Sequence, residues 1–325
     1  LAPFVPALSR FEEPLDLNLV FSGHGKHLDC PTLRLTNHHG LMIAGEAALS
    51  NWDAGMDMYI YGKLGNLTMT KEGINVLMTN LTGKVPPILQ RLDYIRFNGE
   101  AAGYLHDLTL TGLFHTGAGM VKTDVMMSID EQSMSRTYSG SVASADLDLG
   151  KLLNQEKKFG KVDFNVELKG FNYKNRYPES YIKGIISSFE YSQYQYENIM
   201  LDGVYKDGGF NGRLSMDDAN GSVQIDGNFN VAKTIPDFNL KASVKNLRPH
   251  DLHLSDKYEN ASISLGLTAD FTGKSIDDMN GRISLDSLQL NAPDEGGCFL
   301  DNLTITAGQV SGEKELRINS SFMTA

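Results

Sequence analysis

Alternating apolar and polar positions run through most of the chain. In residues 261–271 every second residue from Ala261 to Phe271 is apolar, and Ser, Gly, Thr and Asp lie between them. Successive side chains of a β-strand point to opposite faces, so this pattern predicts a strand with one apolar face. The same alternation recurs in residues 162–168, 223–231 and 238–244. These segments therefore predict strands that share one amphipathic design.

Turn signals separate the predicted strands. Pairs such as Asn220-Gly221 and Asn280-Gly281 recur about every 8 to 14 residues, and such residues tolerate the positive φ of hairpin turns. This spacing is typical of consecutive antiparallel strands. The sequence therefore predicts an all-β fold.

Helical signals are few. Residues 86–95 begin with Pro-Pro and continue with spaced Ile and Leu, which predicts one short helix with proline at its start. Asp148 to Gly160 predicts a second helix, with Asp148 as its N-cap and Gly160 past its end. We therefore expect at most one or two short helices.

Two distant segments resemble each other. Ser141 to Gly170 and Ser243 to Gly273 each contain a strand, a leucine-rich turn and a long alternating strand that ends in glycine. This internal echo has a spacing of about 100 residues, too loose for a short-repeat solenoid. The chain is expected to be one repeat-built stretch, residues 1–325, with possible sub-units 1–135 and 136–325.

The apolar face of so many strands has to be covered. Open sheets rarely exceed about ten strands without curling, splitting or closing, so packed sandwiches, a barrel and a long sheet bent into a trough all stay open. A sandwich covers its apolar faces with a second sheet, whereas a trough leaves an apolar lining that something else must fill. The candidate lining consists of Val162, Phe164, Val166, Leu168, Val223, Ile225, Phe229, Phe238, Leu240, Val244, Ile263, Leu265, Leu267 and Phe271.

Composition excludes several classes of protein. The chain has 325 residues, of which 41% are hydrophobic and 21% charged, so it has a core to bury and is not intrinsically disordered. Its net charge of −11 repels phosphate backbones, which argues against nucleic acid as a partner. No apolar run exceeds four residues, far below the roughly 18 that span a bilayer. The first residues, LAPFVPALSR, lack a signal peptide, and we expect this chain to be a piece of a longer protein.

No group of residues predicts a catalytic or metal centre. Cys30 and Cys298 lie far apart and do not form a CxxC pair; they are either two separate thiols or one disulfide. The histidine pairs in residues 24–27, 38–39 and 250–253 offer two imidazoles each, but a catalytic zinc site needs three protein ligands. Adjacent carboxylates at 217–218 and 277–278 are typical of turns. We expect a non-enzymatic protein with no metal and no cofactor.

A tyrosine-rich stretch leaves two readings open. Tyr191, Tyr194 and Tyr196 lie at alternating or near-alternating positions, and their rings would suit stacking on sugars. Alternating tyrosines also occur as amphipathic strand or edge residues, which is the interpretation we favour. The stretch therefore predicts either carbohydrate contact or a sheet edge.

Residues 240–290 resemble the repeated segments of TamB proteins, which belong to the AsmA-like, bridge-like lipid transfer superfamily, and especially those of Bacteroidetes. The resemblance lies in Leu-Arg-Pro-His at 247–250, Ala-Asp-Phe-Thr-Gly at 269–273 and Asn-Gly-Arg-Ile-Ser at 280–284. Weaker matches at 144–153 and 169–171 extend it across about residues 90 to 325. These patterns carry no catalytic residues.

The resemblance implies an elongated antiparallel sheet rolled along its length into a groove, an arrangement known as a β-taco. It implies a periplasmic protein, anchored in the inner membrane by an N-terminal helix, that shelters phospholipid acyl chains between inner and outer membrane and aids outer-membrane protein assembly. An outer-membrane barrel partner and any membrane contact would involve parts of the protein outside this chain. The chain is then an internal stretch of a lipid conduit.

Two other functions are compatible with the same pattern. An array of β-sandwich modules would serve a structural or adhesive role and bind sugar or protein. A groove of the same kind can also hold nascent outer-membrane strands by pairing at an exposed strand edge.

Overall fold

The computed structural model describes residues 15–321 apart from 131, 134, 173–178, 258, 276, 294, 295, 311 and 312. The N-terminal segment LAPFVPALSR lies outside the described residues. The chain divides into two compact units, Leu1–Asn165 and Val166–Ala325. The prediction of folding sub-units 1–135 and 136–325 stays a prediction.

The first unit is an antiparallel sheet whose strands follow chain order. From β1 to β8 each strand pairs with the next, and β9 lies beside β8, where the Ser144 hydroxyl donates to Val162 O and accepts from Phe164 N. The strands are β1 (Asp16–His24), β2 (His27–Thr36), β3 (Leu41–Ser50), β4 (Tyr59–Thr70), β5 (Tyr94–Tyr104), β6 (Asp107–Thr116), β7 (Gly119–Ile129), β8 (Arg136–Asp148) and β9 (Phe159–Asn172), whose last residues belong to the second unit.

The second unit repeats this arrangement. Each strand from β10 to β18 pairs antiparallel with the next. The strands are β10 (Glu179–Tyr191), β11 (Tyr194–Lys206), β12 (Gly209–Asp218), β13 (Gly221–Asn230), β14 (Asp237–Leu247), β15 (Ser262–Thr272), β16 (Asn280–Ala292), β17 (Gly296–Val310) and β18 (Glu313–Ser320). The predicted all-β, antiparallel fold class is confirmed.

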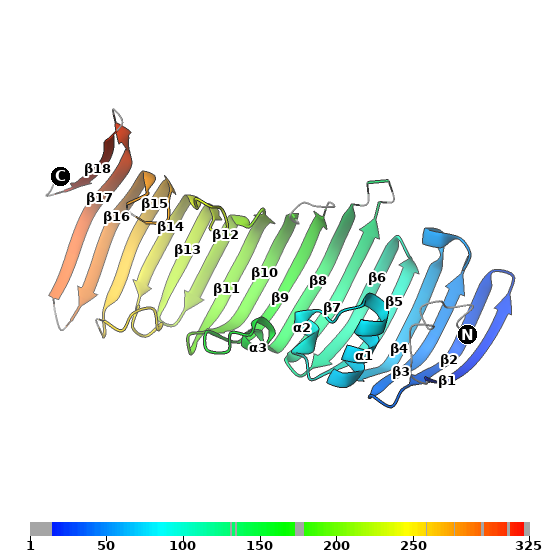
Figure 1. Ribbon diagram of the computed structural model, residues 1–325. Coiled ribbons are helices and arrows are strands. Elements are labelled where there is room, and N and C mark those ends of the chain that lie inside the picture. The colour runs from blue at the N-terminus through cyan, green and yellow to red at the C-terminus, as the bar shows by residue number, and fades with distance from the viewer. Residues whose placement is uncertain are drawn as a thin grey trace. The chain divides into compact units, whose positions relative to one another are not determined.

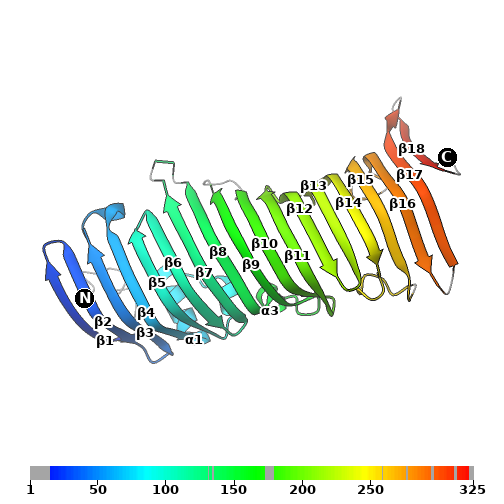
Figure 2. The same ribbon diagram turned by 180° about the vertical axis from the view of Figure 1, so that it is seen from behind.

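Within each unit the sheet is a single layer. Among the described residues, strands contact their sequence neighbours, and no second sheet packs on them. Of the arrangements that the alternation left open, each unit therefore has the open sheet rather than the sandwich. Figure 2, which shows the reverse of the view in Figure 1, displays the strands of the first unit with the helices behind them.

The helices differ from the prediction in number. Three short α-helices are described rather than one or two: α1 (Lys71–Thr82), α2 (Pro87–Gln90) and α3 (Leu149–Leu153), with a 3-10 turn at Gly55–Asp57. The prediction missed α1, although Ile74, Leu77, Met78 and Leu81 have the i, i+3, i+4, i+7 spacing of a helix. Thr70 caps this helix by accepting from Gly73 N, and Gly83 ends it in the left-handed conformation.

The two predicted helices are present but shorter. Pro87 begins α2, which stops at Gln90, so the predicted Ile95 end lies in β5. Asp148 caps α3 as predicted and accepts from Lys151 N at 2.8 Å. That helix ends at Leu153, because Asn154 adopts the left-handed conformation, and Gly160 lies in β9. Among the described residues, no helix has the length and apolar character needed to cross a membrane.

Candidate functional site

Strand register places ten of the fourteen lining candidates on one face of the second unit. In the second unit, residues directly opposite across a ladder share a face, and they form rows across β13, β14 and β15. Val223, Val244 and Leu265 make one such row. Ile225, Ala242 and Leu267 form a second row, and Phe229, Phe238 and Phe271 form a third. On the same face Leu240 pairs with Ala269, and Ile263 pairs with Leu247.

The remaining four candidates lie on β9. Val162 and Phe164 flank the Ser144 hydroxyl in the first unit, and Val162 is buried. Val166 and Leu168 continue the same alternation in the part of β9 that belongs to the second unit. All candidates other than Val162 are half-buried, because flanking strands shield their sides while nothing described lies over most of them. Their part in lipid binding stays a prediction.

The first unit has an apolar face that the prediction largely missed. Register continues this face from β2 to β7 through pairs such as Leu35 with Ile43 and Leu110 with Val125. The signal was present in the sequence as alternation at residues 108–114, where Leu108, Leu110 and Phe114 share this parity. The opposite face carries a polar row across β3 to β7: Glu46, Lys63, Glu100, Thr111 and Asp124.

One edge of the first unit's apolar face is covered by its own chain. Ile74 of α1 and Leu92 form a buried cluster with Ile95 and Ala118, and Leu152 of α3 packs against it. In Figure 1 the helices α1, α2 and α3 lie in front of the lower ends of the strands of the first unit. We call the strand ends beneath these helices, with turns 37–40 and 117–118, the covered edge of the first unit. The ends with turns 25–26, 51–58 and 105–106 form its opposite edge.

Polar contacts anchor this cover. Lys151 Nζ of α3 lies 2.6 Å from Asp93 Oδ2 and donates to Gly117 O at 2.9 Å. The hydrogen bond and charge of Lys151 hold the pKa of Asp93 below its usual value. Arg91 donates to Leu152 O. The cover is thus attached by an ion pair as well as by its apolar underside.

A loop covers the corresponding edge of the second unit. Residues 248–261 connect β14 to β15, and Leu252 in this loop is fully buried at 0% exposure. Tyr196 Oη donates to Leu252 O at 2.8 Å, and His253 Nδ1 lies 2.9 Å from Ser192 O. We call the ends with turns 192–193 and 219–220 the covered edge of this unit. Its opposite edge carries loops 207–208, 231–236 and 273–279.

The tyrosine stretch is part of this cover. Tyr196 is 8% exposed, and its ring packs against Tyr194 with centroids 4.8 Å apart. Tyr194 Oη donates to Asp218 Oδ1 at 2.5 Å and accepts from Asn220 Nδ2 at 3.1 Å. Burial and the bond to Asp218 raise the pKa of Tyr194 to about 12. Of the two readings, the structure gives these rings a place at a sheet edge, packed against protein.

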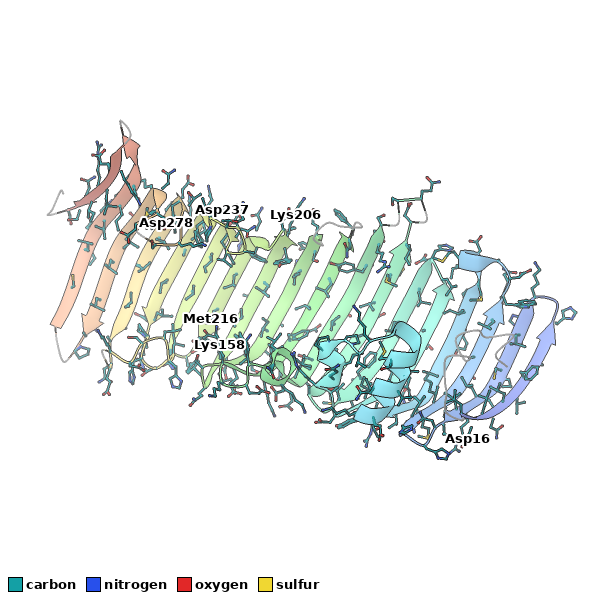
Figure 3. All side chains as sticks on the ribbon, in the orientation of Figure 1. Asp16, Lys158, Lys206, Met216, Asp237 and Asp278 are labelled. Atoms are coloured by element: carbon teal, nitrogen blue, oxygen red, sulfur yellow. The ribbon has the colours of Figure 1, made fainter. Side chains whose placement is uncertain are left out.

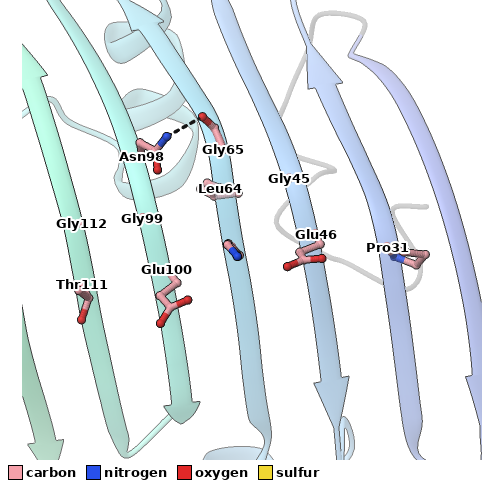
Figure 4. A pocket seen from close by; sticks show the side chains of 11 residues that line it. Pro31, Gly45, Glu46, Leu64, Gly65, Asn98, Gly99, Glu100, Thr111 and Gly112 are labelled. Atoms are coloured by element: carbon pink, nitrogen blue, oxygen red, sulfur yellow. Dashed lines mark hydrogen bonds between the residues drawn. The ribbon is translucent and has the colours of Figure 1, made fainter.

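Cavities lie on both kinds of face. On the polar face of the first unit, a furrow of about 460 Å³ crosses β2 to β6 and is bordered by Glu46, Lys63, Glu100 and Asn98. Figure 4 shows the Glu46 and Glu100 side chains there, and Asn98 Nδ2 donating to Gly65 O. In the second unit a cavity of about 510 Å³ lies at the opposite edge, over Phe238 and Phe271.

The remaining candidate residues are the cysteines, the histidine pairs and the adjacent carboxylates. Cys30 is a buried free thiol and Cys298 an exposed one. His27 contacts Ser50 and Asp29. Across the described part of the chain, no three His, Cys, Asp or Glu side chains are placed to hold a metal ion. Backbone hydrogen bonds from Lys274 and Ser275 lower the pKa of Asp278 to about 2, so this carboxylate stabilises its own loop.

Comparison with known proteins adds no relative. No protein-family model, no curated protein and no solved structure matches the chain. The functional argument therefore rests on the geometry of the faces and edges described above.

Proposed function

We propose that this protein shelters phospholipid acyl chains on the apolar faces of its units. The observation that supports this proposal is that rows of Val, Ile, Leu and Phe share one face of a single-layer sheet and stay half-buried. Fully burying such a side chain contributes about 1.5–3 kcal/mol, so a half-covered row leaves a sizeable free energy for a ligand to recover. An acyl chain is a ligand whose whole surface suits such a row.

Repetition of similar rows supports movement of the ligand. Each buried methylene contributes about 0.8 kcal/mol, so a chain that leaves one apolar row for water loses its binding energy. A chain that slides from one row of β13–β15 to the next exchanges one set of aliphatic contacts for another. Transport along such a face needs no catalytic group.

The cellular setting is part of the same proposal. By its resemblance to TamB proteins, the chain is an internal, periplasmic segment of a lipid conduit between inner and outer membrane, and it aids outer-membrane protein assembly with a barrel partner. This setting rests on the residue patterns at 247–250, 269–273 and 280–284.

Organic extraction of the purified chain, followed by mass spectrometry, tests the proposal. The protein is purified without detergent beside a globular protein handled identically, and we expect stoichiometric phospholipid from this chain alone. A lipid-free and stable protein would overturn the proposal and favour an adhesive or structural role.

A pair of variants on β15 locates the ligand. Phe271→Asp puts a carboxylate on the apolar face, whereas Thr268→Asp puts the same charge on the exposed polar face of the same strand. We expect Phe271→Asp, and likewise Leu265→Asp, to reduce the extracted lipid several-fold and Thr268→Asp to leave it unchanged. Equal lipid content in both would place the ligand elsewhere.

A further inference from the structure

The cavity at the opposite edge of the second unit joins an apolar floor to a charged rim. Its floor contains Phe238 and Phe271, whose rings stack with centroids 4.7 Å apart and planes 20° apart, together with Ile283 and the buried Met279. This floor is the end of the apolar row formed by Phe229, Phe238 and Phe271. A ligand lying along the apolar face can therefore reach the cavity without leaving apolar contact.

Two loops form the rim. Gly273 N donates to Pro236 O at 3.0 Å, which joins loop 231–236 to loop 273–279. Lys274 and Ser275 line the cavity from the second loop. Figure 3 labels Asp237 and Asp278 near each other at this edge of the second unit.

Two carboxylates at this rim, Asp278 and Asp237, are already engaged, and a third, Asp277, is exposed in the same loop as Lys274. Asp278 accepts from Lys274 N at 2.9 Å, from Ser275 N at 2.6 Å and from Ser275 Oγ at 2.9 Å. Asp237 pairs with Lys233 at 2.8 Å. Within the described residues, no carboxylate lies in ion-pair distance of Lys274 Nζ. The rim therefore presents one ammonium group without an acidic partner.

We propose that this cavity seats the glycerophosphate end of a phospholipid, with the phosphodiester at the Lys274 ammonium and the first acyl carbons on the Phe238–Phe271 floor. The inference rests on the proposed function and adds a binding site for the phosphodiester that every phospholipid carries. An ammonium group on a flexible stem binds phosphate as a point charge, and the apolar floor supplies the rest of the contact. The floor alone fits any hydrocarbon chain and the ammonium alone fits any anion, whereas an amphiphile with an anionic group next to its acyl chains satisfies both.

Short-chain lipids that stay monomeric in water test the inference. Calorimetry on the full chain compares dihexanoyl phosphatidylglycerol, dihexanoylglycerol, hexanoate and inorganic phosphate. We expect Lys274→Gln to weaken the phospholipid about three- to tenfold, the range for one charge-assisted contact in partial solvent, and to leave dihexanoylglycerol unchanged. Lys241→Gln is the matched control, because Lys241 lies on the polar face of β14.

Each other outcome has a definite meaning. Equal phospholipid affinity in Lys274→Gln and Lys241→Gln would overturn the inference. Inorganic phosphate or hexanoate binding as tightly as the phospholipid would also overturn it, since the site would then recognise a free anion or a fatty acid. If extraction of the unmodified chain yields phospholipid and Lys274→Gln binds normally, the inference alone fails. If extraction yields none, the proposed function fails first.

Discussion

The β7–β9 region of the first unit and the β13–β15 region of the second share one backbone arrangement, here called the device, which leads the chain from a strand into a covering segment. The side chains that hold the covering segment, its anchors, differ between the two regions. Asp148 N donates to Ala118 O at 2.6 Å, and Arg248 N donates to Asn220 O at 2.9 Å. The residues two positions earlier, Asp146 and Asn246, both have a positive φ, 53° and 48°. Each device turns the chain out of a strand and into the element that covers the apolar face.

Glycines at the start of the adjoining strands complete the device. Gly119 and Gly221 have φ of 122° and 136°, values that L-residues with side chains rarely adopt. A Cβ at Gly119 would lie 2.4 Å from Asp146 O, and one at Gly221 would lie 2.5 Å from Leu247 Cα. The close approach of these backbones therefore depends on glycine at both positions.

The anchors of the two covers have different chemistry. In the first unit a helix is fixed by the Lys151–Asp93 ion pair, and in the second an irregular loop is fixed by the Tyr196 hydroxyl and a fully buried leucine. The comparison teaches that the two units share the backbone route to a cover, whereas the side chains that hold the cover differ.

Removing the buried leucine should have the largest effect. Leu252 is fully buried, so Leu252→Ala should lower the free energy of unfolding by about 2–5 kcal/mol. Leu152 is half-buried at the corresponding place, and Leu152→Ala should cost about half as much. Urea unfolding followed by circular dichroism measures both. Equal losses would show that the two covers are packed alike.

Replacing Gly221 by alanine should cause the second-largest loss in the free energy of unfolding. Gly221→Ala forces a Cβ against Leu247 Cα and should cost about 1–3 kcal/mol. Gly62→Ala is the control, because a Cβ there meets nothing within 4 Å. The same unfolding experiment separates them. A stable Gly221→Ala would mean that the β13–β14 backbones separate easily.

The anchors should differ in their response to salt. Tyr196→Phe removes one neutral hydrogen bond and should cost about 1 kcal/mol at any ionic strength. Lys151→Met removes a partly exposed ion pair and should cost at most about 1 kcal/mol, less in 1 M salt because of screening. Unfolding at low and high salt distinguishes them. A salt-dependent loss in Tyr196→Phe would contradict this assignment.

The smallest expected effect is a pH dependence of the second cover. The pKa of Tyr194 is raised from 10.0 to about 12, so the folded state keeps its proton more tightly than the unfolded state. The resulting stabilisation is complete below pH of about 10 and is lost as pH rises toward about 12. The difference in urea midpoint between the unmodified chain and Tyr194→Phe, measured from pH 8 to 11.5, should shrink with pH. A constant difference would mean that Tyr194 does not titrate in this range.

Local patterns predicted the strands but not what lies over them. Alternation from Ala261 to Phe271 has a strand's period of two, and the register confirms the shared face. Asp148 was predictable as a cap because capping is a contact over three residues. Helix α1 carried a local signal that the prediction missed, the helical spacing of Ile74, Leu77 and Met78, but its packing over β4 and β5 was not predictable from that spacing.

The role of the tyrosines was hidden for a related reason. Tyr196 donates to a carbonyl 56 residues away, and Tyr194 to a carboxylate 24 residues away. No pattern within the tyrosine stretch contains these partners. The apolar face of a single strand can be predicted from the sequence of that strand. The segment that covers this face depends on residues that come close only in the folded sheet.

Covers along a single edge have a kinetic consequence for the proposed cargo. Among the described residues, no α-helix covers the opposite edge of the first unit, and at the opposite edge of the second unit loops 231–236 and 273–279 border the 510 Å³ cavity. A lipid can then exchange sideways at many points instead of threading from an end. Its residence time is set by how many methylenes touch the wall at once, and a single obstruction delays passage without stopping it.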